Sequence, residues 1–190
     1  MIIGITGTLG AGKGTIVEYL VRKLGFKHFG VSDTFLTGEA LKRGLKPDRV
    51  IRRIIANEFR AKGPTKLMEE VYKLAKDAIV KKENIIIEPQ HTVPEVAFIH
   101  TLGGIEFAVD APLEVRYERI KKRGGEKDQI SFEEFRKEQE FQMSQKDPNK
   151  NNLAKAMAKA DYHIQNSGTR EELFIKIESV LRSIKQSLPK

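Results

Sequence analysis

The residues with the clearest chemical potential lie near the start of the chain, in the stretch GTLGAGKGT from Gly7 to Thr15. A phosphate-binding loop needs glycines, because only they follow the tight, partly left-handed path that turns backbone N–H groups toward anionic oxygens. It also needs a lysine for the β- and γ-phosphates and a hydroxyl for Mg²⁺. The candidates for these contacts are Gly7, Gly10, Ala11, Gly12, Lys13, Gly14 and Thr15. The stretch therefore predicts ATP and Mg²⁺ as cofactors.

The elements on either side have the form that such a loop requires. Residues 1–6 predict a short buried strand, and residues 13–24 carry apolar side chains at helical spacing. A bound anion would then face a helix N-terminus. The alternative is a chance glycine turn beside a lysine, which the agreement of strand, loop and helix disfavours.

Short apolar segments alternate with amphipathic ones along the rest of the chain. We expect further strands at 26–31, 85–88, 104–109 and 162–165, and helices at 32–43, 47–62, 65–81, 94–101, 113–123, 153–160 and 170–186. The charged segment 124–152 predicts helix and loop. Alternating short strands and helices predict βαβ units, hence an α/β fold whose parallel sheet is covered on both faces.

Length and composition set outer limits. A chain of 190 residues, 39% hydrophobic and 32% charged, fits one soluble domain. The absence of cysteine excludes disulfides and thiolate chemistry. The longest apolar runs are too short to span a bilayer and no secretory signal is visible, so we expect a cytoplasmic protein without a membrane partner.

The formal net charge of +8 is concentrated in one stretch. Residues 41–82 contain 13 Lys and Arg against 5 Asp and Glu, whereas the rest of the chain balances. A nucleic-acid surface could have this composition, as could the wall of a pocket for a small polyanion. Aromatic residues are sparse in the stretch, which argues against a surface that stacks bases.

The phosphate loop departs from the usual pattern in one position that carries a family resemblance. Gly14 stands directly after Lys13, where Ser or Thr is usual, and Thr15 follows. The run G-x-x-G-x-G-K-G-T resembles the loop of nucleoside monophosphate kinases such as adenylate kinase, and dephospho-coenzyme A kinases have a close relative of it. The resemblance implies a three-layer P-loop NTPase fold in one domain. Its parts would be a core at 1–31, 83–123 and 153–190, an acceptor-binding insertion at about 32–82, and a lid at about 124–152.

Two further stretches resemble the acceptor side of these kinases. In VSDTFLTGEALKRG, Ser32 and Asp33 match a Ser/Asp pair placed near the accepting group, although either residue could simply cap a helix. In IIIEPQHTVPEV, Glu88 stands where a Walker B acid orients Mg²⁺ or the nucleophile. A solvated Glu at the end of a strand is the alternative there. His91 stands where a D-G-x-R pattern would place arginine.

Arginines follow in the segment that resembles the lid and its hinge. Arg116, Arg119 and Arg123 share one helical face, and the resemblance implies that such arginines neutralise the transferring phosphoryl group. A merely solvated face is the alternative. We favour Arg119 and Arg123 over Arg116, and take Arg136 as the lid arginine.

The last stretch with a resemblance is ADYHIQNSGTREEL, which is similar to the loop that contacts adenine in dephospho-coenzyme A kinases. Asn166 and Gly168 would lie in that loop, although N-S-G would form a turn in any case. Within the basic stretch, Arg53 and especially Arg60 are candidates for holding a phosphate of the acceptor. The four histidines show no metal-ligand spacing.

Together these features predict transfer of the ATP γ-phosphoryl group to a small, phosphate-bearing nucleotide acceptor, such as a nucleoside monophosphate or dephospho-coenzyme A. The predicted catalytic residues are Lys13, Asp33, Glu88, Arg119, Arg123 and Arg136, and the predicted metal-binding residues are Thr15 and Glu88. The predicted acceptor contacts are Ser32, Asp33, Arg53, Arg60 and His91. The alternative is a P-loop ATPase with a regulatory or RNA-associated role that uses the surface of 41–82. We expect a monomer or small homo-oligomer.

Overall fold

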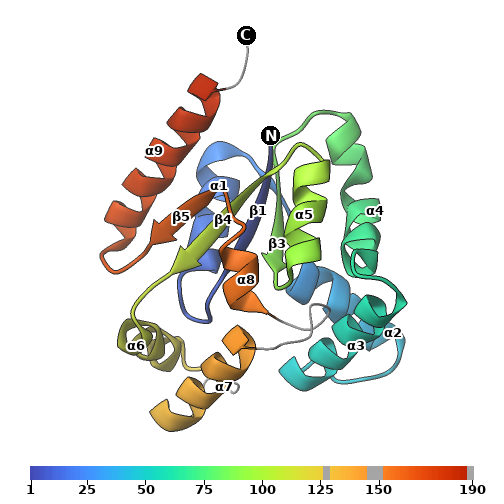
Figure 1. Ribbon diagram of the computed structural model, residues 1–190, viewed down its shortest axis with the longest axis vertical. Helices are drawn as coiled ribbons and strands as arrows, with labels where there is room; N and C mark the ends of the chain where they lie inside the picture. Colours follow the sequence, from blue (N-terminus) through green and yellow to red (C-terminus); the bar gives the residue numbers. More distant parts are fainter. Residues whose placement is uncertain (126–128, 145–151, 188–190) are drawn as a thin grey trace.

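The computed structural model describes residues 1–125, 129–144 and 152–187. Its centre is a five-stranded parallel sheet with the order β2-β3-β1-β4-β5 (Figure 1). The strands are β1 (Ile2–Gly7), β2 (Lys27–Gly30), β3 (Ile85–Gln90), β4 (Ile105–Asp110) and β5 (Tyr162–Gln165). The predicted strands are confirmed, with β3 continuing two residues beyond Glu88.

The helices surround this sheet. They are α1 (Lys13–Leu24), α2 (Thr37–Lys42), α3 (Arg49–Lys62), α4 (Lys66–Val80), α5 (Val93–Thr101), α6 (Leu113–Arg123), α7 (Phe132–Ser144), α8 (Leu153–Met157) and α9 (Arg170–Ser187). Helices α1 and α6 begin and end where the sequence predicts, and a glycine in the left-handed region ends each of them. Helix α8 is three residues shorter than predicted, and residues 145–151 of the expected lid lie outside the described residues.

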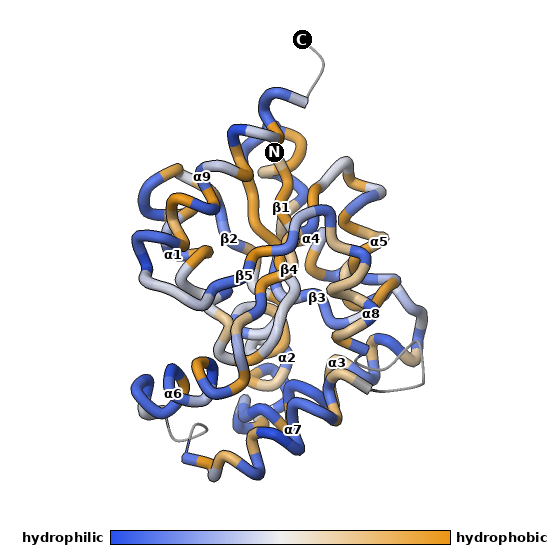
Figure 2. The backbone as a smooth tube through the Cα atoms, turned by 60° about the vertical axis from the view of Figure 1, so that its left-hand side comes forward, coloured by the Kyte–Doolittle hydropathy of each residue, from blue (hydrophilic) through white to orange (hydrophobic). Residues whose placement is uncertain are grey.

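Alternating side chains of the strands build two apolar cores. Ile86 packs with residues of α1 and α9 on one face, whereas Ile85 and Ile87 pack with residues of α4 and α5 on the other. Apolar residues accordingly concentrate in the central strands, such as β1 and β4 (Figure 2). The sheet is thus the middle of three layers, which confirms the predicted α/β class.

An ionisable side chain is fully buried within the sheet. Glu106 of β4 lies beside Gly4 of β1 and is completely shielded from solvent. A Cβ atom at Gly4 would stand 1.8 Å from its Oε2 atom, so the glycine provides the space for this carboxyl group.

The segment after β2 excludes the helix-capping alternative for Ser32 and Asp33. A π-helical turn (Val31–Leu36) precedes α2, and the turn is capped by Gly30 without a side-chain hydrogen bond. Asp33 instead accepts a hydrogen bond from Arg52 of α3, with an Nη1–Oδ1 distance of 2.6 Å. The helix-capping alternative is therefore wrong for both residues, because the segment enters its helix through a wider turn.

The two ends of the described chain lie on one side of the molecule. In Figure 1 the start of β1 and the end of α9 are both near the top, whereas α6 and α7 lie at the opposite end. In the described ranges, no helix has the length and apolar character needed to cross a membrane.

Candidate functional site

The phosphate loop connects the carboxyl end of β1 to the first turn of α1. Gly7, Gly10 and Gly12 have φ angles of 144°, 81° and 105°, a region that L side chains rarely adopt. A Cβ atom at Gly7 would lie 2.1 Å from the carbonyl oxygen of Val109. The glycines thus bring the loop close to β4 and aim it at the start of α1, where an anion can meet free N–H groups.

Lys13 is folded back onto this loop. Its Nζ atom donates to the carbonyl oxygens of Gly7 and Thr8 at 2.7 and 2.9 Å. Burial, with a smaller contribution from the nearby Arg116, lowers the pKa of Lys13 to about 8, against the opposing effect of Glu88. An anion in the loop would relieve this cost, because it would give the ammonium group a negative partner.

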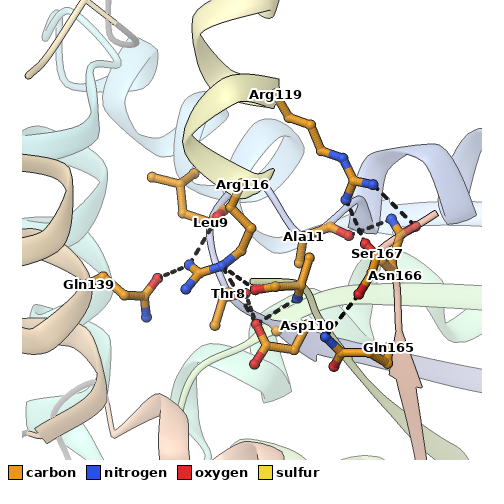
Figure 3. A network of polar contacts seen from close by, with 12 residues as sticks. Thr8, Leu9, Ala11, Asp110, Arg116, Arg119, Gln139, Gln165, Asn166 and Ser167 are labelled. Carbon is orange, nitrogen blue, oxygen red and sulfur yellow. Dashed lines mark hydrogen bonds and ion pairs between the residues drawn. The ribbon is translucent and has the colours of Figure 1, made fainter. Parts of the chain in front are cut away.

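Side chains from distant parts of the chain form hydrogen bonds with the phosphate loop (Figure 3). The Thr8 hydroxyl donates to Oδ1 of Asp110 at 2.5 Å, and Nδ2 of Asn166 donates to the Ala11 carbonyl at 2.7 Å. The backbone N–H of Asn166 also donates to the carbonyl of Asp110 at 2.7 Å. Asn166 is thus more than a turn residue. Sequence reasoning missed Asp110, whose signal is an acid at the end of a buried strand.

Two arginines of α6, Arg116 and Arg119, donate hydrogen bonds within this network. Arg119 donates to the carbonyls of Asn166 at 2.9 Å and Gly168 at 3.2 Å. Arg116 is only 5% exposed and donates to the carbonyls of Ala111 and Leu9. The solvated-face alternative is therefore wrong for Arg116, which the sequence ranked below its neighbours.

A cleft of about 720 Å³ extends from the loop toward α3 and α7. Its size is in the range of small-molecule sites. Eight cationic side chains line it, against four acidic ones. The cationic residues are Lys13, Arg49, Arg52, Arg53, Arg60, Arg119, Arg123 and Arg170, and the acidic residues are Glu18, Asp33, Glu88 and Glu138. The excess of positive charge suits a polyanionic ligand.

The cleft brings together most of the predicted acceptor and catalytic residues. Ser32, Asp33, Glu88 and His91 line it, as do the predicted arginines of α3 and α6. Arg136 does not line the cleft, and it pairs instead with Glu133 of the same helix at 2.6 Å. Its expected position in the cleft is not observed.

Arg53 and Arg60 of α3 differ in what they offer a ligand. Arg60 is 4% exposed, and its Nε donates to Oε1 of the buried Glu95 at 2.8 Å. Burial opposes the charge of Glu95, yet Arg60 holds the pKa of that carboxyl below its usual value. Arg53 is exposed at the cleft wall and has no ion-pair or hydrogen-bond partner among the described residues. Arg53 is therefore the better placed of the two for an anionic group.

His91 and Glu88 form the end of the cleft beside β3. Burial lowers the pKa of His91 to about 4, and the charges of Arg60 and Lys13 act in the same direction. The imidazole is therefore neutral at pH 7 and does not replace the charge of an arginine. Glu88 lies 3.0 Å from Nε2 of His28, measured from its Oε1 atom.

The comparisons with known proteins agree with this architecture. A family model described as an AAA domain matches residues 3–143. A UPF0200 protein of Sulfurisphaera tokodaii is 31% identical over 189 residues, which cover 96% of this chain and 97% of that protein. This chain belongs to the UPF0200 family.

Solved kinases share the fold of this UPF0200 protein. The shikimate kinase of Aquifex aeolicus matches with a TM-score of 0.57 at 20% identity, over 99% of this chain and 100% of that one. The deoxyadenosine kinase of M. mycoides, solved with dCMP and dCDP, also has a TM-score of 0.57, at 18% identity over 96% of this chain and 100% of that one. The P-loop kinase-like fold is thereby confirmed.

The cleft of this UPF0200 protein has the ligand types that Mg²⁺ prefers. Thr15 and Glu88 contribute a hydroxyl and a carboxylate at its wall. The described residues contain no group of three or more His, Cys, Asp and Glu that could hold a metal by themselves. Mg²⁺ at kinase sites is usually bound by one or two protein oxygens together with substrate phosphates, so this sparse set fits it.

Proposed function

We propose that this protein is an ATP-dependent kinase that phosphorylates a small, phosphate-bearing nucleotide acceptor, of the nucleoside monophosphate or dephospho-coenzyme A type. One observation carries the proposal: a single cationic cleft joins the phosphate loop and Lys13 to Asp33 and Arg53. Donor and acceptor can therefore meet in one enclosed space, which is what direct transfer requires.

The residues of the cleft divide into those that hold the donor and those that balance its charge. Lys13 would leave the loop carbonyls for the β- and γ-phosphates. Thr15 and Glu88 would hold Mg²⁺, which neutralises phosphate charge when bound. Arg119 and Arg123 reach the cleft from α6 and would stabilise the phosphoryl group in transit.

The acceptor side is formed by the turn after β2 and by α3. Arg53 can bind a phosphate oxygen pair with its guanidinium group, since no described residue occupies it. Asp33 lies at the same wall and would orient the accepting group. The same arrangement supports the pocket-wall interpretation of the basic stretch 41–82, because four of its arginines line the cleft. An RNA-associated ATPase is less well supported.

The experiment that tests this function is an ATP-consumption screen. The wild-type protein with Mg·ATP is supplied with nucleoside monophosphates, dephospho-coenzyme A, shikimate or RNA. We expect consumption to rise with a phosphate-bearing nucleotide and the product to gain one phosphate. ATP hydrolysis that only RNA stimulates would instead favour the alternative.

Substitution of the loop lysine is the matched test. Lys13→Met should abolish transfer and leave the circular dichroism spectrum unchanged, because the hydrogen bonds of the ammonium group go to loop carbonyls and join no other element of the core. Lys23→Met is the control, since Lys23 is an exposed residue of the same helix outside the cleft. Transfer that survives Lys13→Met would contradict the proposed function.

A further inference from the structure

Helix α7 carries two consecutive side chains that contact different parts of the molecule. The carboxylate of Glu138 accepts a hydrogen bond from Nη1 of Arg49 in α3, at 2.7 Å. The next residue, Gln139, accepts one from Nη1 of Arg116 in α6. One turn of α7 therefore contacts both the acceptor-binding insertion and the helix that supports the phosphate loop.

Arg116 extends the second contact to the phosphate loop itself. Its Nη1 atom, which donates to Gln139, also donates to the carbonyl of Leu9 at 3.3 Å (Figure 3). Its Nε atom is fixed on the Ala111 carbonyl at 2.8 Å, and its guanidinium lies 5.7 Å from the ring centre of Phe135 in α7. Because one nitrogen serves both oxygens, a shift of α7 changes the hydrogen bond to the loop.

The second contact, between Gln139 and Arg116, is buried. Arg116 is 5% exposed and Gln139 is 7% exposed. In such a shielded place water cannot substitute for a lost partner, so a displaced Gln139 leaves a polar group unsatisfied. The backbone also transmits a shift, because a Cβ atom at Gly10 would be only 2.7 Å from the Arg116 carbonyl oxygen.

The first contact is of the opposite kind. The side chains of Arg49 and Glu138 are 30% and 25% exposed, and both line the cleft. Arg49 lies on the same helix as Arg53, the arginine proposed for the acceptor. An anion bound at this wall competes with Glu138 for Arg49, and the ion pair therefore responds to what the acceptor pocket contains.

We propose that α7 couples the two substrate sites, with Arg116 as the positioning residue that links the helix to the phosphate loop. The Arg49–Glu138 ion pair changes when an anion binds at the proposed acceptor wall. The hydrogen bonds of Arg116 to Gln139 and to Leu9 transmit the resulting shift of α7 to the loop. This rests on the proposed function, since it needs a nucleotide in the loop. Couplings of this kind change affinity by about 5- to 150-fold.

The experiment uses amide hydrogen exchange of the whole protein, with and without a non-hydrolysable ATP analogue and Mg²⁺. In the wild type we expect the analogue to slow exchange in α7 and also in α3, by about fivefold or more. Gln139→Leu should bind the analogue and lose the slowing in α3. Arg116→Lys should behave like Gln139→Leu, because an ammonium group cannot reproduce the fixed Nε and Nη1 contacts.

Two further variants complete the design. Arg136→Met is the control on the same helix, since its partners Glu133 and Glu140 also belong to α7, and it should keep the wild-type response. Glu138→Gln weakens the exposed contact with Arg49 and leaves the buried one intact. It therefore replaces Gln139→Leu as the test if that variant does not fold. It too should lose the slowing in α3.

The possible failures are distinguishable. If the wild type does not bind the analogue, the proposed function fails and the coupling fails with it. If Gln139→Leu or Glu138→Gln binds the analogue and α3 is slowed as in the wild type, the coupling is wrong and the proposed function stands. Acceptor-free binding is sufficient for each of these outcomes.

Discussion

At the scale of single residues, Lys13 holds a charge that its surroundings disfavour. Burial keeps its pKa at about 8 in the unliganded loop, and a bound polyphosphate would raise that pKa. We therefore expect nucleotide binding above pH 8 to take up a proton, and affinity to fall as the pH rises further. Titration calorimetry at pH 8.5 in two buffers of different ionisation enthalpy measures the uptake.

The control for this prediction is Lys13→Arg, whose side chain stays charged throughout the range and should bind without proton uptake. Equal calorimetric enthalpies for the wild type in both buffers would contradict the prediction. The same shift affects unliganded stability. Since the unfolded chain binds the proton more tightly, this group favours folding increasingly as the pH rises from about 8 to 10.5.

At the scale of elements, two of the cleft arginines on α3, Arg60 and Arg53, have different roles. Arg60 joins α3 to α5 through the buried Glu95, so Arg60→Met leaves a carboxylate shielded from water without its guanidinium partner. We expect the free energy of unfolding to fall by about 3 kcal/mol. Urea denaturation measures this loss.

Arg53→Met is the matched variant on the same helix. Because Arg53 is exposed, its loss should change stability by less than about 0.5 kcal/mol. It should instead raise the KM for the acceptor. An Arg60→Met variant with unchanged stability and a raised KM for the acceptor would contradict the structural role of Arg60. It would support instead the acceptor-binding role that the sequence predicts for this residue.

Local patterns determined how much of these elements the sequence could predict. The strands and helices α1 and α6 follow from apolar runs, periodic spacing and terminal glycines, all of which are local signals. Local spacing ranks Arg116 below its neighbours on α6, because its partner Leu9 is 107 residues away in the sequence. The sequence places Arg136 at the cleft, where it is not observed, because spacing within α7 does not tell which side of that helix faces the cleft.

The phosphate-loop side of the cleft was more predictable than the acceptor side for the same reason. A contiguous motif specifies the loop, and the structure gives it the left-handed glycines that the motif implies. The wall proposed for the acceptor combines the turn after β2 with α3, and the ion pairs of its arginines to α5 and α7 depend on tertiary packing. Asp110 and Glu95, which organise the two sides, carry no motif of their own.

At the scale of the whole molecule, Glu106 affects the stability of the sheet that all these elements share. Burial, and then the negative charges of Asp161 and Glu95, raise its pKa well above the usual value. The folded protein therefore binds this proton more tightly than the unfolded chain. Stability contributed by the group is present at low pH and is lost as the pH rises above about 4.5 toward the folded-state pKa.

We expect Glu106→Gln to be more stable than the wild type at pH 8, with a smaller difference at pH 5, because the amide cannot lose a proton and become a buried anion. Urea denaturation at the two pH values measures the free energies of unfolding. Glu178→Gln, at an exposed position of helix α9, is the control for the Glu-to-Gln substitution itself. A pH-independent difference for Glu106→Gln would contradict the prediction.

The placement of the chain ends has a practical and evolutionary consequence. Met1 and the end of α9 lie on the side of the sheet away from the cleft (Figure 1). An additional domain joined there, or a tether to a sensor surface, would leave the route into the cleft unobstructed. A module added at either end would therefore lie away from the cleft.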